Sequence, residues 1–370
     1  MNLLYLDFIR YSIGAAEYDD SHFRNMDWQG LFNFGMKQSL LGVLLAGIKR
    51  LKSTDGINPH ILLKFITVAH KTKCLNISIN NTALKLGKEL DDAGFIHCIL
   101  KGPGLASLYP DPLARIPGDI DMWTANVKDA RNRRGLSTAK SRKRVIEYVK
   151  RKFPDAEVAY YHIDYPVFKD VAVELHFMPV RMVRYWHNRR LQRWLDTVAE
   201  RQFSHVVTLA GAGDAAVVTS EFNVVYLLAH ILRHLTSEGV GMRQLMDYYY
   251  LLMNLDIRSG EYTELLHRFG LMKIAGAVMW VLGDVLMLPR ERMIAVPNEK
   301  RGRRLLDVVI HGGNFGFYND KIDRRRGHVV RCYLDKLGYR CGLLRDYPEE
   351  VLWTYIFTFW QKLWKLWKGY

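Results

Sequence analysis

The spacing of apolar residues changes twice along this chain, and those changes constrain the fold more than any other feature. From residue 3 to residue 90, apolar side chains recur at three- and four-residue steps, which predicts helices. Short apolar segments rich in β-forming residues then follow at 95–100, 119–124, 156–168 and 171–177. From residue 181 the helical spacing returns for most of the remaining chain.

This order predicts an α+β protein with three regions. We expect a helical N-terminal region at 1–90, a core with a mixed sheet at 91–180, and a mostly helical C-terminal region at 181–370. The chain is long enough for such a division, and 49% hydrophobic with 25% charged residues is ordinary for a protein that buries sizeable cores.

The sequence argues against a membrane-spanning protein and against a disulfide-rich one. No run of about 18 uncharged apolar residues occurs, so no membrane span is expected. The four cysteines, at positions 74, 98, 332 and 341, form no CxxC pair, which argues against a zinc ribbon and a disulfide framework. The expected location is the reducing cytoplasm.

Positive charge is concentrated in one segment of this basic protein. The net charge is +15, and residues 128–152 hold eleven Lys and Arg against Asp129 and Glu147, a local net charge of +9. A block of this size can attract RNA or an acidic partner through long-range electrostatics. A solvated helix face with an adjoining loop is the alternative interpretation.

Two aspartates lie one residue apart on the segment 119–124. Successive side chains of a strand point to opposite faces, so Asp119 and Asp121 project together while Ile120 and Met122 face the other side. Two carboxylates on one face repel each other unless a cation lies between them. Hard oxygen ligands suit Mg²⁺ or Mn²⁺, which makes this pair a candidate metal site.

A third carboxylate is available about fifty residues later. In the segment 171–177 the valines and Leu175 alternate with Ala172, Glu174 and His176, so Glu174 and His176 share one face. If this strand lies beside the Asp119 and Asp121 strand, the three acids converge. Three such acids can hold two metal ions, the arrangement that serves in-line phosphoryl displacement.

A glycine turn precedes the two aspartates. Gly102 and Gly104 follow a predicted buried strand and open a short helix, where a phosphate can approach the backbone closely. Lys101 and Arg115 can add positive charge to a triphosphate site. We therefore predict a nucleotide-binding role for these four residues.

These motifs together resemble the uncharacterised nucleotidyltransferase family of the DNA polymerase β-like superfamily. The resemblance is carried by LKGPGLASLYPDPLARIPGDIDMWT and VAVELHF, and further along by HILRHLTSEGVGMRQLMDYYYLL and GGNFGFY. It implies a nucleotidyltransferase-fold sheet core, and the matching motif positions are Gly102, Asp119, Asp121 and Glu174. Superfamily members usually carry Gly-Ser or Gly-Gly at the turn, whereas this chain has Pro103, which lacks both a hydroxyl and a backbone N–H.

Further residues are candidates for a substrate cleft. His176 shares a face with Glu174, and His230 and His234 lie four residues apart on a predicted helix. Zinc binding by these two histidines lacks a third ligand in the sequence. Arg243 either contacts substrate or pairs with Asp247, four residues later.

The resemblance implies a metal-dependent nucleotidyltransferase that moves a nucleoside monophosphate from an NTP to an acceptor hydroxyl. Asp119 and Asp121 would bind two Mg²⁺ or Mn²⁺ ions, and Glu174 would complete the acceptor-side site and take the acceptor proton. The acceptor is left open among protein, small molecule and RNA. The alternative is a catalytically inactive protein of the same fold that binds a nucleotide, RNA or a partner, as in a toxin–antitoxin or defence system.

Overall fold

The computed structural model describes residues 3–127, 138–169, 171–256, 260–318 and 329–368. The chain forms two compact units, and each is built from separate stretches of sequence. The sheet unit comprises 74–113, 117–229 and 352–370, and the helical unit comprises 1–73, 114–116 and 230–351. The three regions predicted along the sequence stay a prediction.

The sheet unit contains a four-stranded mixed sheet in the order β1-β2-β4-β3. Its strands are β1 (Phe95–Ile99), β2 (Ile120–Asn126), β3 (His162–Asp164) and β4 (Val173–His176). β2 runs antiparallel to β1 and parallel to β4, and β3 runs antiparallel to β4. A separate hairpin pairs β5 (Val206–Leu209) with β6 (Gly213–Ala216). The α+β class predicted from the sequence is confirmed.

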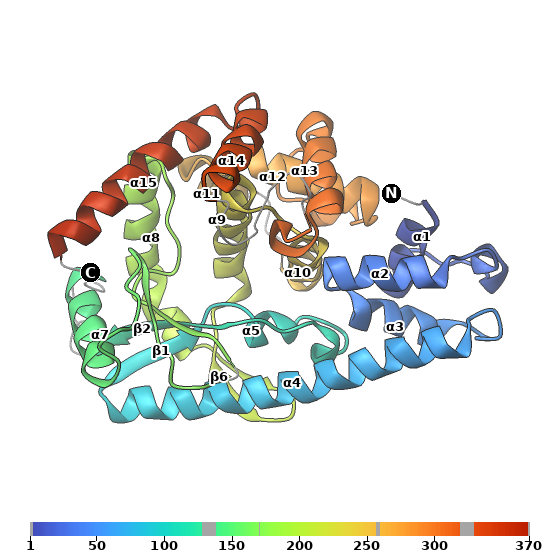
Figure 1. The fold of residues 1–370 in the computed structure, drawn as a ribbon, viewed down its shortest axis with the longest axis horizontal. Helices are drawn as coiled ribbons and strands as arrows, with labels where there is room; N and C mark the ends of the chain where they lie inside the picture. The colour runs from blue at the N-terminus through green and yellow to red at the C-terminus, as the bar shows by residue number, and fades with distance from the viewer. Residues whose placement is uncertain (1–2, 128–137, 170, 257–259, 319–328, 369–370) are drawn as a thin grey trace. The chain divides into compact units, whose positions relative to one another are not determined.

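Helices cover both faces of this sheet. Ile120 and Met122 face a core that includes apolar residues of α4 (Pro59–Asp92) and α7 (Thr138–Lys152), and Figure 1 shows both helices beside the strands. On the opposite face Trp123 packs on Phe203 of α8 (Tyr185–Ser204) and on Phe222 of α9 (Ser220–Ser237). Asp121 shares the face of Trp123, since the two are separated by one residue.

The helix α4 runs unbroken from Pro59 to Asp92. Just before its first residue, the Asn58 side chain accepts the backbone N–H of His60 at 2.9 Å. Its buried residues Ile79, Ala83, Leu86 and Leu90 form one apolar face toward the sheet. Tertiary packing of this face compensates for the weak helix formers around Asn80 and Asn81.

The strand predicted at 156–168 is much shorter in the structure, where it covers only His162–Asp164. The N–H of Ala159 donates to the carbonyl of His162 at 3.0 Å, and Val158 pairs with Ile163 in an isolated bridge. The chain therefore reverses within this segment, and only its second part joins the sheet.

The helical unit is built from helices and short turns of helix. Its helices are α1 (Leu3–Ser12), α2 (Trp28–Gln38), α3 (Leu41–Arg50), α10 (Met242–Asn254), α11 (Glu261–Arg268), α12 (Met272–Trp280), α13 (Glu299–Gly312) and α14 (Val329–Leu343). No helix of the described residues is both long and apolar enough to cross a membrane.

The basic segment 128–152 lies only partly within the described residues, because residues 128–137 fall outside them. In α7, Lys152 pairs with Glu89 of α4, and the Arg142 guanidinium lies over the rings of Tyr160 and Trp364. Part of the local positive charge is therefore engaged in contacts inside the sheet unit.

The C-terminal helix α15 (Pro348–Lys368) has two kinds of aromatic residue. Phe357, Trp360 and Trp364 contact the ring of Tyr160 in the sheet unit. Trp367 is exposed. One set of aromatic side chains on α15 thus packs on the sheet unit.

Glu89 anchors a polar cluster in the sheet unit, and its removal should be measurable. Its carboxylate accepts hydrogen bonds from Tyr148 at 3.0 Å and from Lys152 and Tyr165. Burial alone would raise the pKa of Glu89, but these three donors lower it below its ordinary value. We expect Glu89→Gln to cost about 1–3 kcal/mol of unfolding free energy at pH 7, measured by urea denaturation.

The sign of the pH dependence follows from the lowered pKa. The contribution of Glu89 is present above its unfolded pKa of about 4.3 and is lost as pH falls through the lower folded pKa. The difference in unfolding free energy between wild type and Glu89→Gln should therefore become smaller below about pH 4. Glu147→Gln is the control, because Glu147 is exposed and lies 3.7 Å from Lys143. An equal loss for Glu89→Gln at pH 3 and pH 7 would contradict the assignment.

Candidate functional site

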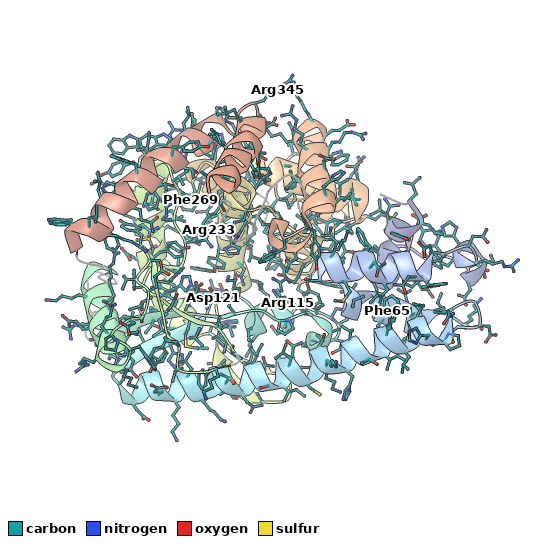
Figure 2. The ribbon with its side chains drawn as sticks, in the orientation of Figure 1. Phe65, Arg115, Asp121, Arg233, Phe269 and Arg345 are labelled. Atoms are coloured by element: carbon teal, nitrogen blue, oxygen red, sulfur yellow. The ribbon has the colours of Figure 1, made fainter. Side chains whose placement is uncertain are left out.

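Strand pairing in the sheet unit brings the three predicted acids together. Asp121 of β2 is the register partner of Glu174 of β4, and Asp119 lies one residue before β2 begins. Asp119, Asp121 and Glu174 each offer a carboxylate oxygen, and these oxygens lie within 4.8 Å of one another. Figure 2 shows Asp121 among the strands of the sheet, where its side chain is only 1% exposed.

Lys101 lies beside the two aspartates. The backbone N–H of Leu100 donates to the carbonyl of Asp121 at 2.9 Å. Lys101 is the next residue, so its backbone lies beside the start of β2. Its Nζ lies 2.8 Å from Oδ2 of Asp121 and 3.6 Å from Oδ2 of Asp119. Burial would lower the pKa of Lys101, but the two carboxylates raise it above its ordinary value, so Lys101 stays charged.

His176 lies between Asp121 and Glu174 and contacts both. Its Nε2 lies 2.9 Å from Oδ1 of Asp121 and 3.0 Å from Oε2 of Glu174. Burial would lower the pKa of His176, but these two carboxylates raise it above its ordinary value. Lys101 and His176 therefore supply the positive charge that balances the acids in this state.

The two aspartates differ in their electrostatics. The negative charge of Asp121 is the main cause that raises the pKa of Asp119. Burial would raise the pKa of Asp121, but Lys101 and His176 hold it below its ordinary value. Asp119 is therefore the acid whose charge is least compensated, and it is also the more exposed of the two.

The carboxylate set fits a divalent cation. Three oxygen ligands from separate side chains meet within one cluster, and the raised pKa of Asp119 reflects an excess of negative charge there. A cation held by Asp119, Asp121 and Glu174 would relieve this repulsion. Mg²⁺ and Mn²⁺ are the metals that such ligands favour.

Gly102 forms the turn between β1 and α5 (Pro103–Ala106). Its φ of 65° is in the region that favours glycine, and a Cβ there would lie 3.4 Å from the backbone oxygen of Asp119. Gly104 packs against Val217, where a Cβ would lie 3.2 Å from the valine side chain. Because α5 has only four residues and starts with Pro103, its helix dipole is small.

Arg115 belongs to the helical unit, whereas Lys101, Gly102 and Gly104 belong to the sheet unit. Its Nε and Nη2 donate to the two carboxylate oxygens of Asp247 at 2.7 and 2.8 Å, and Figure 2 labels it. Arg243 donates to the carbonyl of Ile116 at 3.1 Å. The partner of Asp247 identified in the structure is thus Arg115, and the pairing of Arg243 with Asp247 stays a prediction.

His230 and His234 also belong to the helical unit, in contact with each other on α9. Nδ1 of His234 lies 3.3 Å from Oε2 of Glu238. Neither histidine is part of a metal-ligand cluster within the described part of the chain. The grouping of His176, His230, His234 and Arg243 in one cleft stays a prediction.

Sequence reasoning missed His162 of β3. Its Nδ1 lies 3.0 Å from Oε2 of Glu174, and its register partner is His176. The only signal for it in the sequence was the alternation of polar and apolar residues in His162-Ile163-Asp164. Which strand this segment joins depends on pairing between distant parts of the chain, so the contact with Glu174 could not be read from the sequence.

Comparison with known proteins adds to this geometry. The family model described as "Uncharacterised nucleotidyltransferase" matches residues 24–286. The chain belongs to this nucleotidyltransferase family. The match covers the whole Asp119, Asp121 and Glu174 cluster and extends well into the helical unit.

The other comparisons add less to the nucleotidyltransferase assignment. No curated protein matches the chain. Among solved structures, an antigenic nucleotidyltransferase-like protein from Paracoccidioides brasiliensis is similar, with 12% sequence identity and a TM-score of 0.34. That similarity covers 62% of this chain and 96% of the other, and at this TM-score it carries no argument about function.

Proposed function

We propose that this protein is a metal-dependent nucleotidyltransferase that moves a nucleoside monophosphate from an NTP to an acceptor hydroxyl. The observation that carries the proposal is the meeting of Asp119, Asp121 and Glu174 in a chain of a nucleotidyltransferase family. Three convergent carboxylates at the two central strands of the sheet are a ligand set that suits phosphoryl transfer with divalent metals.

Asp119, Asp121 and Glu174 would hold the divalent cation, Mg²⁺ or Mn²⁺. When bound, such a cation supplies positive charge that stabilises the transferring phosphoryl group and favours ionisation of the acceptor. Asp119 is the ligand open to solvent, and Asp121 is fixed in the sheet by Lys101 and His176. Asp119 is thus free to adjust its position to the cation, whereas Asp121 is held in place.

Glu174 acts in this proposal as a ligand and not as the proton acceptor. Burial would raise its pKa, but the adjoining imidazoles of His162 and His176 hold the pKa well below its ordinary value. A carboxylate with a lowered pKa is a weak base, so it is poorly suited to take a proton from an acceptor hydroxyl. The acceptor proton then passes to solvent.

The phosphates of the NTP would lie near Lys101 and the Gly102 turn. Lys101 is charged and adjoins both aspartates, so a cation that neutralises the acids frees its ammonium group to contact phosphate. Gly102 lets the backbone come close to a ligand, whereas Pro103 offers no N–H. Positive charge on Lys101 therefore replaces the hydroxyl and amide that other superfamily turns provide.

The chemical class of the acceptor and the cellular compartment of the protein can also be proposed. The basic segment 128–152 favours an anionic acceptor or partner such as RNA, and a salt titration of RNA binding tests this. The cysteines Cys74, Cys98 and Cys341 are free, in keeping with a cytoplasmic location.

A second candidate function rests on Pro103. A catalytically inactive protein of the same fold could hold a nucleotide, RNA or a partner without transferring anything, as a component of a toxin–antitoxin or defence system. The proline at the turn is the observation that favours it, because Pro103 removes a donor from the phosphate-binding position.

Two measurements on the full chain test the proposal. The first is the thermal shift with each of the four NTPs, with and without Mg²⁺ or Mn²⁺. The second is release of pyrophosphate, with candidate acceptors supplied in pools. We expect a metal-dependent shift with at least one NTP, followed by pyrophosphate release. A shift without pyrophosphate under any condition supports the binding protein, and the absence of any shift overturns the nucleotide site itself.

A further inference from the structure

Two histidines flank Glu174 on neighbouring strands. In the antiparallel register of β3 and β4, His162 pairs with His176. Nδ1 of His162 and Nε2 of His176 each lie 3.0 Å from the same oxygen, Oε2 of Glu174. All three side chains offer one ligand atom within a common cluster. This cluster shares Glu174 with the carboxylate site but adds two ring nitrogens.

The contact between His162 and Glu174 is close without being a good hydrogen bond. Nδ1 of His162 is buried and finds no hydrogen-bond partner of suitable geometry within the described residues, although Oε2 is 3.0 Å away. The nitrogen and the oxygen approach each other, yet the ring N–H direction misses the oxygen. Two ligands of one cation show this kind of approach, because both aim at the ion and not at each other.

The separation of the ligand atoms also suits a shared ion. Imidazole nitrogens and carboxylate oxygens bind Zn²⁺ at about 2.0–2.2 Å, so two ligands at the tetrahedral angle are roughly 3.4 Å apart. The separations of Oε2 from Nδ1 of His162 and from Nε2 of His176 are both 3.0 Å. To accept an ion, the cluster needs shifts of a few tenths of an ångström and the loss of the proton from Nε2 of His176, which also lies 2.9 Å from Oδ1 of Asp121.

Ligand chemistry separates this cluster from the carboxylate site. Imidazole favours Zn²⁺ and neighbouring transition metals, whereas an all-oxygen set favours Mg²⁺. His162 is 13% exposed and His176 4% exposed, so both rings are held in place by the sheet. A pair of fixed imidazoles with one carboxylate is a ligand set that leaves positions open for water or a substrate group.

We propose that His162, Glu174 and His176 form a subsite for a transition metal ion of the Zn²⁺ or Co²⁺ class, next to the Asp119 and Asp121 carboxylates. The inference goes beyond nucleotidyl transfer, because it concerns binding of the metal alone and holds whether or not an NTP is turned over. It assigns His162, which no sequence motif identified, as a metal ligand.

The experiment uses Co²⁺ as the probe on the metal-free full chain. Binding is followed by the visible absorption of Co²⁺ bound to nitrogen and oxygen ligands, and the stoichiometry for Zn²⁺ is measured by equilibrium dialysis. We expect one tight site in wild type and a loss of affinity of roughly tenfold or more in His162→Ala, since even outer-shell changes at metal sites cost 10–100-fold. His162→Asn is measured in parallel, so that a folding defect of the alanine variant does not decide the result.

One control variant makes the result specific. His97 lies 3.2 Å from Asp91 and is 16% exposed, so His97→Ala removes a comparable histidine beside a carboxylate that has no third ligand among the described residues. We expect this control to bind Co²⁺ as wild type does. Asp119→Asn removes a carboxylate-site ligand and keeps both histidines, so it reports Co²⁺ that binds at the carboxylate site instead.

Either of two results overturns the inference. One is Co²⁺ binding by folded His162→Ala and His162→Asn that equals wild type. The other is loss of binding in Asp119→Asn without loss in the His162 variants. Pyrophosphate release is measured separately, so a protein that binds Co²⁺ through His162 but releases no pyrophosphate keeps this inference and overturns the proposed function. The reverse result overturns this inference alone.

Discussion

Asp119→Asn is expected to lower metal-dependent pyrophosphate release by about a thousandfold or more while leaving the fold intact. The carboxylate of Asp119 is 38% exposed and is the solvent-facing member of the three acids. Its loss removes one anionic ligand from the site, and a difference of several kcal/mol in transition-state stabilisation corresponds to a rate factor of this size. The measurement is pyrophosphate release from the preferred NTP at saturating Mg²⁺ or Mn²⁺.

The same substitution should not destabilise the protein. Because the charge of Asp121 raises the pKa of Asp119, neutralising Asp119 removes a repulsion in the folded state. We therefore expect the melting temperature of Asp119→Asn, without metal, to equal or slightly exceed that of wild type. A lost activity with an unchanged or higher melting temperature separates a functional role from a structural one.

Asp111→Asn is the matched control for this result. Asp111 lies eight residues before Asp119 in the sequence, is exposed, and accepts the backbone N–H of Leu113, a bond that asparagine can also accept. We expect its turnover to equal that of wild type. Undiminished turnover in Asp119→Asn would remove the metal mechanism from this site.

Arg115→Ala is expected to have the largest effect on stability. Arg115 and Asp247 form a bidentate ion pair inside the helical unit, and their side chains are 6% and 5% exposed. Removing the arginine leaves a buried carboxylate without this charge partner, which typically costs about 3–5 kcal/mol. Urea denaturation followed by circular dichroism measures this loss.

An exposed ion pair of the same unit is the control. Arg303 pairs with Glu299 at 2.8 Å, but both side chains are more than half exposed. Arg303→Ala should therefore cost no more than about 1 kcal/mol. A double variant, Arg115→Met with Asp247→Leu, should recover most of the loss, because it removes both buried charges together. If Arg115→Ala costs no more than Arg303→Ala, the ion pair does not stabilise the unit.

These variants also address the nucleotide role predicted for Arg115. In the structure, Nε and Nη2 of Arg115 donate to Asp247. A role in stability is therefore measured by denaturation, and a role in phosphate binding is measured separately by NTP binding. The NTP-dependent thermal shift of Arg115→Lys, compared with that of wild type, tests the phosphate role. A loss of the shift without a loss of stability would favour the sequence prediction.

Local sequence pattern was enough for part of the site. The two-residue period of a strand places Asp119 and Asp121 on one face, and the same period places Glu174 beside His176. Gly102 was identified by its place after a buried strand, and the structure gives it a positive φ. These features depend on neighbours in the chain, so they follow from short-range geometry.

Lengths of elements were harder to predict because tertiary contacts decide them. The helix α4 continues through Asn80 and Asn81 because its apolar face packs on the sheet core. The segment 156–168 contributes only His162–Asp164 to the sheet because the chain reverses between Val158 and Ile163. Local propensity is a weak guide when packing of this kind overrides it.

The sequence by itself determined the α+β class and the three acids of the candidate site, because periodicity and short motifs are local properties of the chain. Only the tertiary structure decided which charges meet. The register of β2 with β4 sets Asp121 opposite Glu174, the pairing of β3 brings in His162, and Asp247 meets Arg115 from 132 residues away. Such contacts depend on strand order and long-range packing, which no local pattern encodes.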